Sequence, residues 1–217
     1  MKALVTGSDG FIGTHLCTML REDGHDVIRL DKKSGNDVIT CDLPNDVHRV
    51  FHLAAQTNAR CADGLEDARD NILSAVRVFS HYRSKVIFAS SSAVNYLVSP
   101  YGISKLACEH YAQFYGCGIV RFCNIHGPGS KSFIDLYVDL PYVNANLPGN
   151  QVRTYAHVLH ACEALLHCKP GELNVLGGVD LTVDDIIKNF YEGKKINWFA
   201  PNEYDVIEGR QVYGVQS

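Results

Sequence analysis

The chain has 217 residues, with 20 lysines and arginines against 24 aspartates and glutamates, so its formal net charge is −4. This balance gives no bulk attraction to nucleic acid or to an anionic membrane. Hydrophobic residues make up 46% and charged residues 20%, which is typical of a globular protein with one sizeable core. No apolar run is long enough to cross a bilayer, and no two of the eight cysteines have Cys-x-x-Cys spacing. We therefore expect a cytoplasmic protein without a disulfide framework or a metal site.

The N-terminus has the order strand, glycine turn, helix. An apolar run over residues 3–5 predicts a buried strand, and Gly7, Gly10 and Gly13 follow at intervals of three before a helical apolar pattern. In such a turn one glycine permits the tight bend, one lets the backbone approach a pyrophosphate, and one lets the helix pack closely. The free N–H groups at the helix start then face the phosphates. The pattern predicts a dinucleotide-binding turn.

Asp31 follows a second expected strand, residues 26–30, and lies 18 positions beyond Gly13. An acidic residue at this place accepts both hydroxyls of an adenosine ribose and repels a 2′-phosphate, which favours NAD over NADP. Lys32 and Lys33 come directly after it and weaken this preference. The alternative is that Asp31 only caps a turn.

The rest of the chain alternates strand and helix patterns, which predicts a parallel sheet covered by helices on both sides. The expected strands are residues 38–40, 50–53, 85–89, 118–122, 151–155 and 173–176, and the expected helices are residues 61–82, 101–115, 156–167 and 183–191. The strand at 38–40 is followed by residues 41–43, and only residues 44–48 separate these from the apolar run at 50–53, too few for a full crossover helix. We expect a Rossmann-type, doubly wound α/β fold in which one helix is shortened or deleted.

A set of polar residues follows the strand at 85–89. Ser91 and Ser92 lie at its carboxyl end, and Tyr101 and Lys105 stand one turn apart on one face of the next helix. A tyrosine with an ordinary pKa of about 10 is too weakly ionised at neutral pH to act as a base, and a neighbouring lysine favours its phenolate. A serine hydroxyl can hold the same substrate oxygen. These residues predict a site that removes a proton from a substrate hydroxyl.

Together the motifs resemble the extended short-chain dehydrogenases/reductases, and among them the nucleotide-sugar epimerases, dehydratases and decarboxylases. The resemblance rests on V-T-G-x-x-G-F-I-G, H-L-A-A, Y-x-x-x-K and R-x-x-N-x-x-G-P, in the family's order, in a chain unusually short for the group. The register of the serines against the family implies that Ser91 is the catalytic hydroxyl, with Ser92 beside it. Asn124 is implied to contact the diphosphate of the nucleotide sugar. The NAD contacts that the resemblance implies are Gly7, Gly10, Phe11, Ile12, Gly13, Asp31, Asp42, Leu43, Leu53, Ala54, Ala55, Tyr101 and Lys105.

The resemblance implies a reaction that begins with oxidation of the sugar at C4, followed by epimerisation, loss of water or loss of CO2. Gln151 and Arg153 lie in G-N-Q-V-R-T-Y, which is nearer to the segment of UDP-glucuronate decarboxylases than to that of epimerases, and Arg153 suits a phosphate or a carboxylate. Ala93 stands where such decarboxylases carry Glu, and no Asp-Glu pair follows Ser92 to support dehydration. We expect a UDP-glucuronate decarboxylase that forms UDP-xylose or its 4-keto intermediate. A UDP-sugar 4-epimerase is the alternative.

We expect an NAD-binding domain over residues 1–128, which also carries the catalytic residues, and a small nucleotide-sugar-binding region over residues 129–217, interleaved with it. A non-catalytic NAD-binding scaffold or sensor is the alternative from another class, since the chain is short. Family members commonly form homodimers through two helices like those at 61–82 and 101–115. Three aromatic residues of the second helix belong either to such an interface or to the core: Tyr111, Phe114 and Tyr115.

Overall fold

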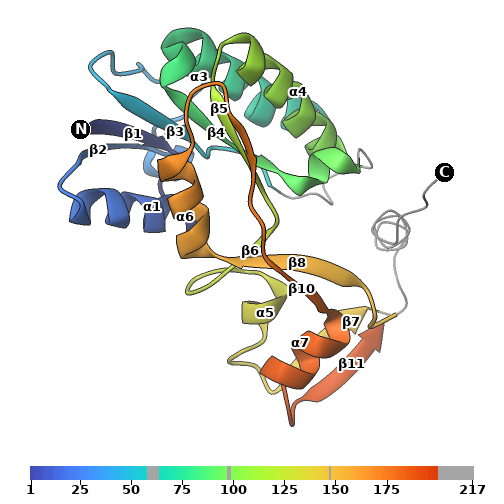
Figure 1. The fold of residues 1–217 in the computed structure, drawn as a ribbon. Coiled ribbons are helices and arrows are strands. Elements are labelled where there is room, and N and C mark those ends of the chain that lie inside the picture. Colours follow the sequence, from blue (N-terminus) through green and yellow to red (C-terminus); the bar gives the residue numbers. More distant parts are fainter. Residues whose placement is uncertain (58–63, 97–98, 147, 200–217) are drawn as a thin grey trace. The chain divides into compact units, whose positions relative to one another are not determined.

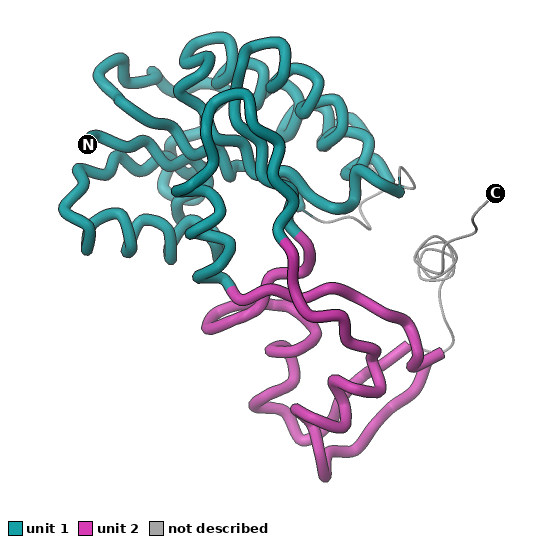
Figure 2. The backbone as a smooth tube through the Cα atoms, viewed as in Figure 1, with its two compact units in different colours: residues 1–122, 158–176 teal, residues 123–157, 177–217 magenta. Residues whose placement is uncertain are grey.

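The computed structural model describes residues 1–57, 64–96, 99–146 and 148–199 (Figure 1). It divides into two units (Figure 2). The first holds residues 1–122 and 158–176, and the second holds residues 123–157 and the described residues from 177 onward. The expected boundary at residue 128 therefore moves to 122. The physical reason is that the strand beginning at Asn124 pairs with a strand of the second unit.

The first unit is built on a six-stranded sheet of order β2-β1-β3-β4-β5-β9, in which every neighbouring pair is parallel. Helices α1 and α6 lie on one face of this sheet, and α3 and α4 lie on the other (Figure 1). This is the doubly wound α/β arrangement, so the predicted fold class is confirmed. The bounds are β1 (Lys2–Thr6), α1 (Phe11–Glu22), β2 (Asp26–Leu30), β3 (Arg49–His52), α3 (Ser74–Tyr82), β4 (Val86–Ser91), α4 (Pro100–Phe114), β5 (Gly118–Phe122), α6 (Val158–His167) and β9 (Leu173–Val175).

The strands of this sheet are buried because helices cover both faces. Leu4, Val50 and Val86 have no exposed surface, which explains why their strands read as continuous apolar runs rather than as alternating ones. Phe79 of α3 packs edge-on against Phe88 of β4, with 5.2 Å between the ring centres. The apolar patterns therefore predicted the central strands correctly.

Residues 38–40, expected as a strand, form a turn that belongs to no sheet of the described chain. The carbonyl of Asp37 closes the turn by accepting the N–H groups of Thr40 at 3.0 Å and Cys41 at 2.8 Å. Val38 is still buried, which accounts for its apolar character without strand pairing. In the described sheet β2 is therefore the edge strand, and β3 pairs with β1 on the other side.

The helix expected over residues 61–82 is described from Gly64 onward, and its first residues lie outside the described part of the chain. It runs as α2 (Gly64–Asp67), a π-helical segment (Ala68–Leu73) and α3. The buried positions of this helix recur every three to four residues, but three of them are polar: Asp67, Asn71 and Ser74. Leu65 is 81% exposed, whereas Asn71 is 2% exposed.

The second unit contains two small sheets, of order β10-β8-β6 and β11-β7. Its core includes Ile134, Val143, Tyr155, Ile186 and Tyr191. The sequence pattern does not predict β7, β10 or β11, because polar residues interrupt each of these short strands. No helix of the described chain has both the length and the apolar character to span a bilayer. The bounds are β6 (Asn124–His126), α5 (Phe133–Leu136), β7 (Tyr142–Asn146), β8 (Val152–His157), β10 (Val179–Thr182), α7 (Val183–Phe190) and β11 (Lys195–Phe199).

Candidate dinucleotide-binding and catalytic site

The turn between β1 and α1 requires glycine at two places, for different reasons. Gly7 has a φ of +68°, and a Cβ on it would lie 2.7 Å from the backbone N of Ala54. A Cβ on Gly13 would lie 2.2 Å from the carbonyl O of Gly7, so only glycine lets α1 pack this closely on the turn. These are the bend and the close packing that the glycine spacing predicts.

The start of α1 presents backbone N–H groups at the glycine turn. Gly10 is the N-cap residue, and none of the described side chains caps this end of the helix. Phe11 and Ile12 are the first two helical residues, so their N–H groups are among the four that lack a partner within the helix. A pyrophosphate fits such a cradle, because it accepts these hydrogen bonds and lies at the positive end of the helix dipole.

The segment after β3 lies directly beside the glycine turn. Thr6 accepts the N–H of Leu53 at its carbonyl, at 3.2 Å, and the N–H of Ala54 at its Oγ1, at 3.3 Å. Ala55 follows in the same segment. Thr6 Oγ1 is also hydrogen-bonded to Nδ1 of His52, at 2.8 Å. Burial lowers the pKa of His52 to about 3, so this ring is neutral at physiological pH.

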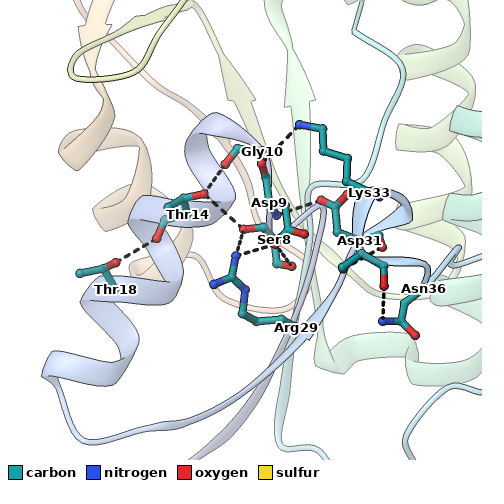
Figure 3. Close-up of polar contacts among 10 residues, drawn as sticks. Ser8, Asp9, Gly10, Thr14, Thr18, Arg29, Asp31, Lys33 and Asn36 are labelled. Atoms are coloured by element: carbon teal, nitrogen blue, oxygen red, sulfur yellow. Dashed lines mark hydrogen bonds and ion pairs between the residues drawn. The ribbon is translucent and has the colours of Figure 1, made fainter.

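Asp31 joins the glycine turn to the short 3₁₀ turn that follows β2 (Figure 3). Its Oδ2 accepts the N–H of Asp9 at 2.9 Å, and its Oδ1 accepts the N–H of Lys33 at 2.8 Å. A carboxylate oxygen accepts more than one hydrogen bond, so a turn cap and a ribose acceptor are compatible roles for Asp31. The contact of Asp31 with a ribose stays a prediction.

Asp42 and Leu43 are predicted to lie near the adenine of NAD. They line a surface hollow with Arg77, Ser80 and His81 of α3 and with Asn45. Leu43 also packs against the core of the first unit. The contacts of both residues with the adenine stay predictions.

Tyr101 and Lys105 lie in the first half of α4, beside the carboxyl end of β4. Nζ of Lys105 donates to the carbonyl O of Ala89 at 2.9 Å and lies 5.9 Å from the centre of the Tyr101 ring. Burial lowers the pKa of Lys105 to about 8, so the ammonium is retained at neutral pH but is lost in mild alkali. A buried cation this close to a phenol favours the phenolate, which is the effect predicted from the spacing.

Ser91 begins a 3₁₀ turn, Ser92–Asn95, and its Oγ accepts the N–H of Ala93 at 3.2 Å. This turn packs against α4. A Cβ on Gly102 would lie 2.7 Å from the carbonyl O of Ala93, so only glycine permits the approach. Gly102 thus lets α4 carry Tyr101 beside the serine turn. Gly102 stands inside the Y-x-x-x-K motif, but the spacing of that motif does not reveal this close approach.

Asn71, in the π-helical segment, connects three parts of the first unit. Its Oδ1 accepts the N–H of Gln56 at 2.7 Å, and its Nδ2 donates to the Gln56 carbonyl at 3.1 Å and to Ser104 Oγ at 2.9 Å. Ser104 in turn donates to the carbonyl of Tyr101 at 2.9 Å. The network ties the segment after β3 to the turn of α4 that carries Tyr101. Asn71 lies on the buried face of the helix with Asp67 and Ser74, where polar side chains take positions that a search for apolar residues does not reveal.

Glu109, one turn beyond Lys105 on α4, holds the ends of β4 and β5. Its Oε1 accepts from Ser90 Oγ at 2.5 Å and from Nε of Arg121 at 2.8 Å, and its Oε2 accepts from Nη2 of Arg121 at 2.6 Å. The Glu109 side chain is 3% exposed. Ser90 and Arg121 are paired across β4 and β5, so one carboxylate holds both strand ends. Ser90 lies between Ala89, whose carbonyl accepts from Lys105, and Ser91.

The residues predicted to bind the sugar nucleotide lie in the second unit. Asn124 begins β6, and its Nδ2 donates to the carbonyl of Thr154 in the neighbouring β8 at 3.0 Å. Arg153 is on β8, opposite Leu181 of β10, and Gln151 is buried just before β8. The structure brings Asn124 to the strand that carries Arg153. Their contacts with a substrate stay predictions.

The parallel sheet, a glycine turn suited to a pyrophosphate, and a tyrosine beside a buried lysine define a Rossmann-type enzyme that uses a dinucleotide. Residues 3–169 match the NAD dependent epimerase/dehydratase family, and the chain belongs to that family. Its cofactor is accordingly NAD.

The chain is 30% identical to a protein of Methanocaldococcus jannaschii whose assignment as a UDP-glucose 4-epimerase is provisional, over 98% of this chain and 88% of that one. It is 27% identical to a UDP-N-acetyl-alpha-D-glucosaminuronate decarboxylase of Bacillus cytotoxicus, over 80% and 72%. MoeE5 in complex with UDP-glucuronic acid and NAD has a TM-score of 0.80 at 26% identity, over 93% of this chain and 86% of that one. The UDP-glucose 4-epimerase of Thermotoga maritima, with a TM-score of 0.79 at 24% identity over 95% and 88%, shares the fold.

Proposed function

We propose that the protein is a UDP-sugar 4-epimerase that works by transient oxidation of its substrate at C4. The observation that carries the proposal is the placement of Tyr101 between a buried Lys105 and the serine turn. When bound, NAD supplies the two-electron oxidant for C4 of the sugar and returns the electrons later. Proton transfer and positioning fall to the side chains of this chain.

In the proposed mechanism, Tyr101 takes the proton of the C4 hydroxyl, and the ammonium of Lys105 stabilises the phenolate. Ser91 Oγ donates a hydrogen bond to the same oxygen, in keeping with its place at the start of the serine turn. Lys105 is oriented by the Ala89 carbonyl, and the helix that carries it is tied in place through Asn71. After the keto sugar turns over, C4 would be reduced on its opposite face, and Tyr101 would return the proton to the C4 oxygen.

Epimerisation is favoured because the chain offers no extra acid beside the serines. The segment Ser92–Asn95 contains no carboxylate, whereas loss of water needs a group that protonates the departing hydroxyl. Epimerisation needs only the Tyr101 and Lys105 pair and a sugar that can turn over. The relative whose match spans 98% of this chain and 88% of its own length also has a provisional epimerase assignment.

Decarboxylation of UDP-glucuronate, with UDP-xylose or its 4-keto precursor as product, is the second candidate. It is favoured by the segment that contains Gln151 and Arg153, because a guanidinium pairs with a carboxylate in bidentate geometry. A relative that is a decarboxylase and a solved neighbour that holds UDP-glucuronic acid lend it support. Ala93 weighs against it, since it leaves the carboxylate without the glutamate that such enzymes carry.

The deciding experiment incubates the protein with NAD and, in turn, UDP-glucose, UDP-galactose and UDP-glucuronate. Mass spectrometry and proton NMR identify the products. An unchanged mass with a new configuration at C4 supports epimerisation, and loss of CO2 from UDP-glucuronate supports decarboxylation instead. Conversion of none of the three would remove both proposals and favour an NAD-binding scaffold or sensor.

A matched pair of variants tests the proposed role of Tyr101. Tyr101→Phe removes only the hydroxyl, and we expect the rate to fall by about 10² to 10⁴. Tyr111→Phe makes the same change at an exposed tyrosine of α4 and serves as the control. Equal activity of the two variants would contradict the mechanism.

We also propose a homodimer that uses α4 and the helix beginning at α2. The two helices pack together, and their outer surfaces carry Leu73, Ile103 and Phe114, each at least half exposed. Tyr115, by contrast, packs against the core. Size-exclusion chromatography with light scattering measures the mass, and Phe114→Asp should shift it toward the monomer.

A further inference from the structure

Three cations lie close to Asp31 in the sequence, and two of them are paired with carboxylates. Nη2 of Arg29 lies 2.5 Å from Oδ1 of Asp9 and 2.9 Å from the carbonyl O of Ser8 (Figure 3). Lys32 pairs with Asp70 on the π-helical segment at 2.9 Å. The backbone N–H of Lys33 donates to Oδ1 of Asp31, and its Nζ lies 3.4 Å from the carbonyl O of Asp9. The lysines that weaken the NAD preference in the sequence are thus both engaged.

Asp9 stands between Asp31 and Arg29. Its N–H donates to the carboxylate of Asp31, and its own carboxylate holds the guanidinium of Arg29. Arg29 and Asp31 are two positions apart along the end of β2, so their side chains leave the strand on the same side. Desolvation opposes ionisation of the Asp9 carboxyl, but hydrogen bonds from Arg29, Ser34 and Ser8 and the charge of Arg29 hold its pKa below the usual range, so Asp9 is anionic at neutral pH. A second negative charge therefore lies beside Asp31, and the arginine nearest to it is neutralised.

From this arrangement we infer that Asp9 is a second determinant of cofactor choice, and that it acts by sequestering Arg29. A 2′-phosphate on the ribose would meet two carboxylates, Asp31 and Asp9, while the guanidinium suited to bind it is engaged. Removing the charge of Asp31 alone leaves the guanidinium of Arg29 paired with the carboxylate of Asp9. Removing both charges releases Arg29 to bind the phosphate. The inference rests on NAD dependence and not on the sugar reaction.

The test measures binding, so it does not depend on turnover. The dissociation constants of NAD and NADP are measured by isothermal titration calorimetry for the wild type, Asp31→Asn, Asp9→Asn, the double variant, and the double variant with Arg29→Met. Asp26→Asn, an exposed aspartate at the other end of β2, is the control for a general loss of negative charge.

We expect Asp31→Asn alone to improve NADP binding modestly. The double variant should bind NADP about tenfold or more tightly than Asp31→Asn does, because it gains one charge-assisted contact. Adding Arg29→Met should cancel the second gain. Equal NADP binding by the double and triple variants would overturn the inference, as would a gain from Asp26→Asn that matches the gain from Asp9→Asn. Asp9→Ser provides the neutral change if Asp9→Asn fails to fold, and retained NAD binding shows that the turn is intact.

Discussion

The ion pair between Glu109 and Arg121 provides the strongest prediction for stability. Arg121→Met removes both guanidinium bonds and leaves the Glu109 carboxylate, whose side chain is 3% exposed, with only the hydroxyl of Ser90. Removing one partner of a buried pair costs about 3–5 kcal/mol, because the remaining charge is left without compensation. Since the total free energy of unfolding of a domain is about 5–15 kcal/mol, the variant should be severely destabilised.

A double variant distinguishes the cost of an unpaired buried charge from the cost of lost packing. The double variant Glu109→Leu/Arg121→Met removes both charges and leaves only the Ser90 hydroxyl without its partner, at about 1 kcal/mol. We expect it to be more stable than Arg121→Met alone, which makes the coupling between the two sites large. Asp46→Asn breaks an ion pair with Lys2 in which the aspartate is 86% exposed, and it should barely move the transition.

Urea unfolding followed by circular dichroism is measured at pH 7 for the wild type, Arg121→Met, Glu109→Leu, the double variant and Asp46→Asn. A loss of less than about 1 kcal/mol in Arg121→Met would refute the reasoning, because such values belong to exposed pairs. A double variant as unstable as the sum of the two single variants would refute it as well. Equal slopes of unfolding free energy against urea show that the variants unfold from comparable states.

Two further predictions follow from buried titratable groups. If Lys105 stabilises the Tyr101 phenolate, Lys105→Met should lower kcat by about 10² or more. Wild-type activity should also decline as the pH rises through about 8, because the buried ammonium loses its proton there. A rate that stays flat to pH 10 would contradict this role. The pKa of His52 is about 3 in the folded protein and 6.5 when unfolded, so the unfolded state binds the additional proton between these values. Its contribution to stability is therefore complete above pH 6.5 and is lost by about 1.4 kcal/mol per unit as the pH falls. The difference in urea midpoint between pH 7 and pH 5.5 should be smaller for His52→Asn, and an unchanged difference would show that another group is responsible.

The parts of the site that the sequence predicted well depend on local geometry. The bend at Gly7 and the packing at Gly13 are decided by residues within one turn, so their spacing is informative. Tyr101 and Lys105 share a helical face because they are four residues apart. The central strands are equally readable, since burial on both faces leaves continuous apolar runs.

Other features depend on partners that are distant in the sequence. The apolar residues at 38–40 indicate burial, but whether a buried segment pairs as a strand depends on an edge being available. Asp42 and Leu43 line a hollow with Arg77, Ser80 and His81 of α3, a contact that no local pattern shows. Asn71 is buried although it is polar, because its partners Gln56 and Ser104 come from segments distant in the sequence.

By itself, the sequence determined the class of fold, the glycine turn and the spacing of the Tyr101 and Lys105 pair, because short-range periodicity and sterics specify each of them. Only the tertiary structure decided how the charges are paired. Glu109 of α4 pairs with Arg121 of β5, and Asp9 of the glycine turn pairs with Arg29 of β2. These pairings depend on strand register, which brings distant residues to within hydrogen-bond distance, and a charge in a one-dimensional sequence does not identify its partner.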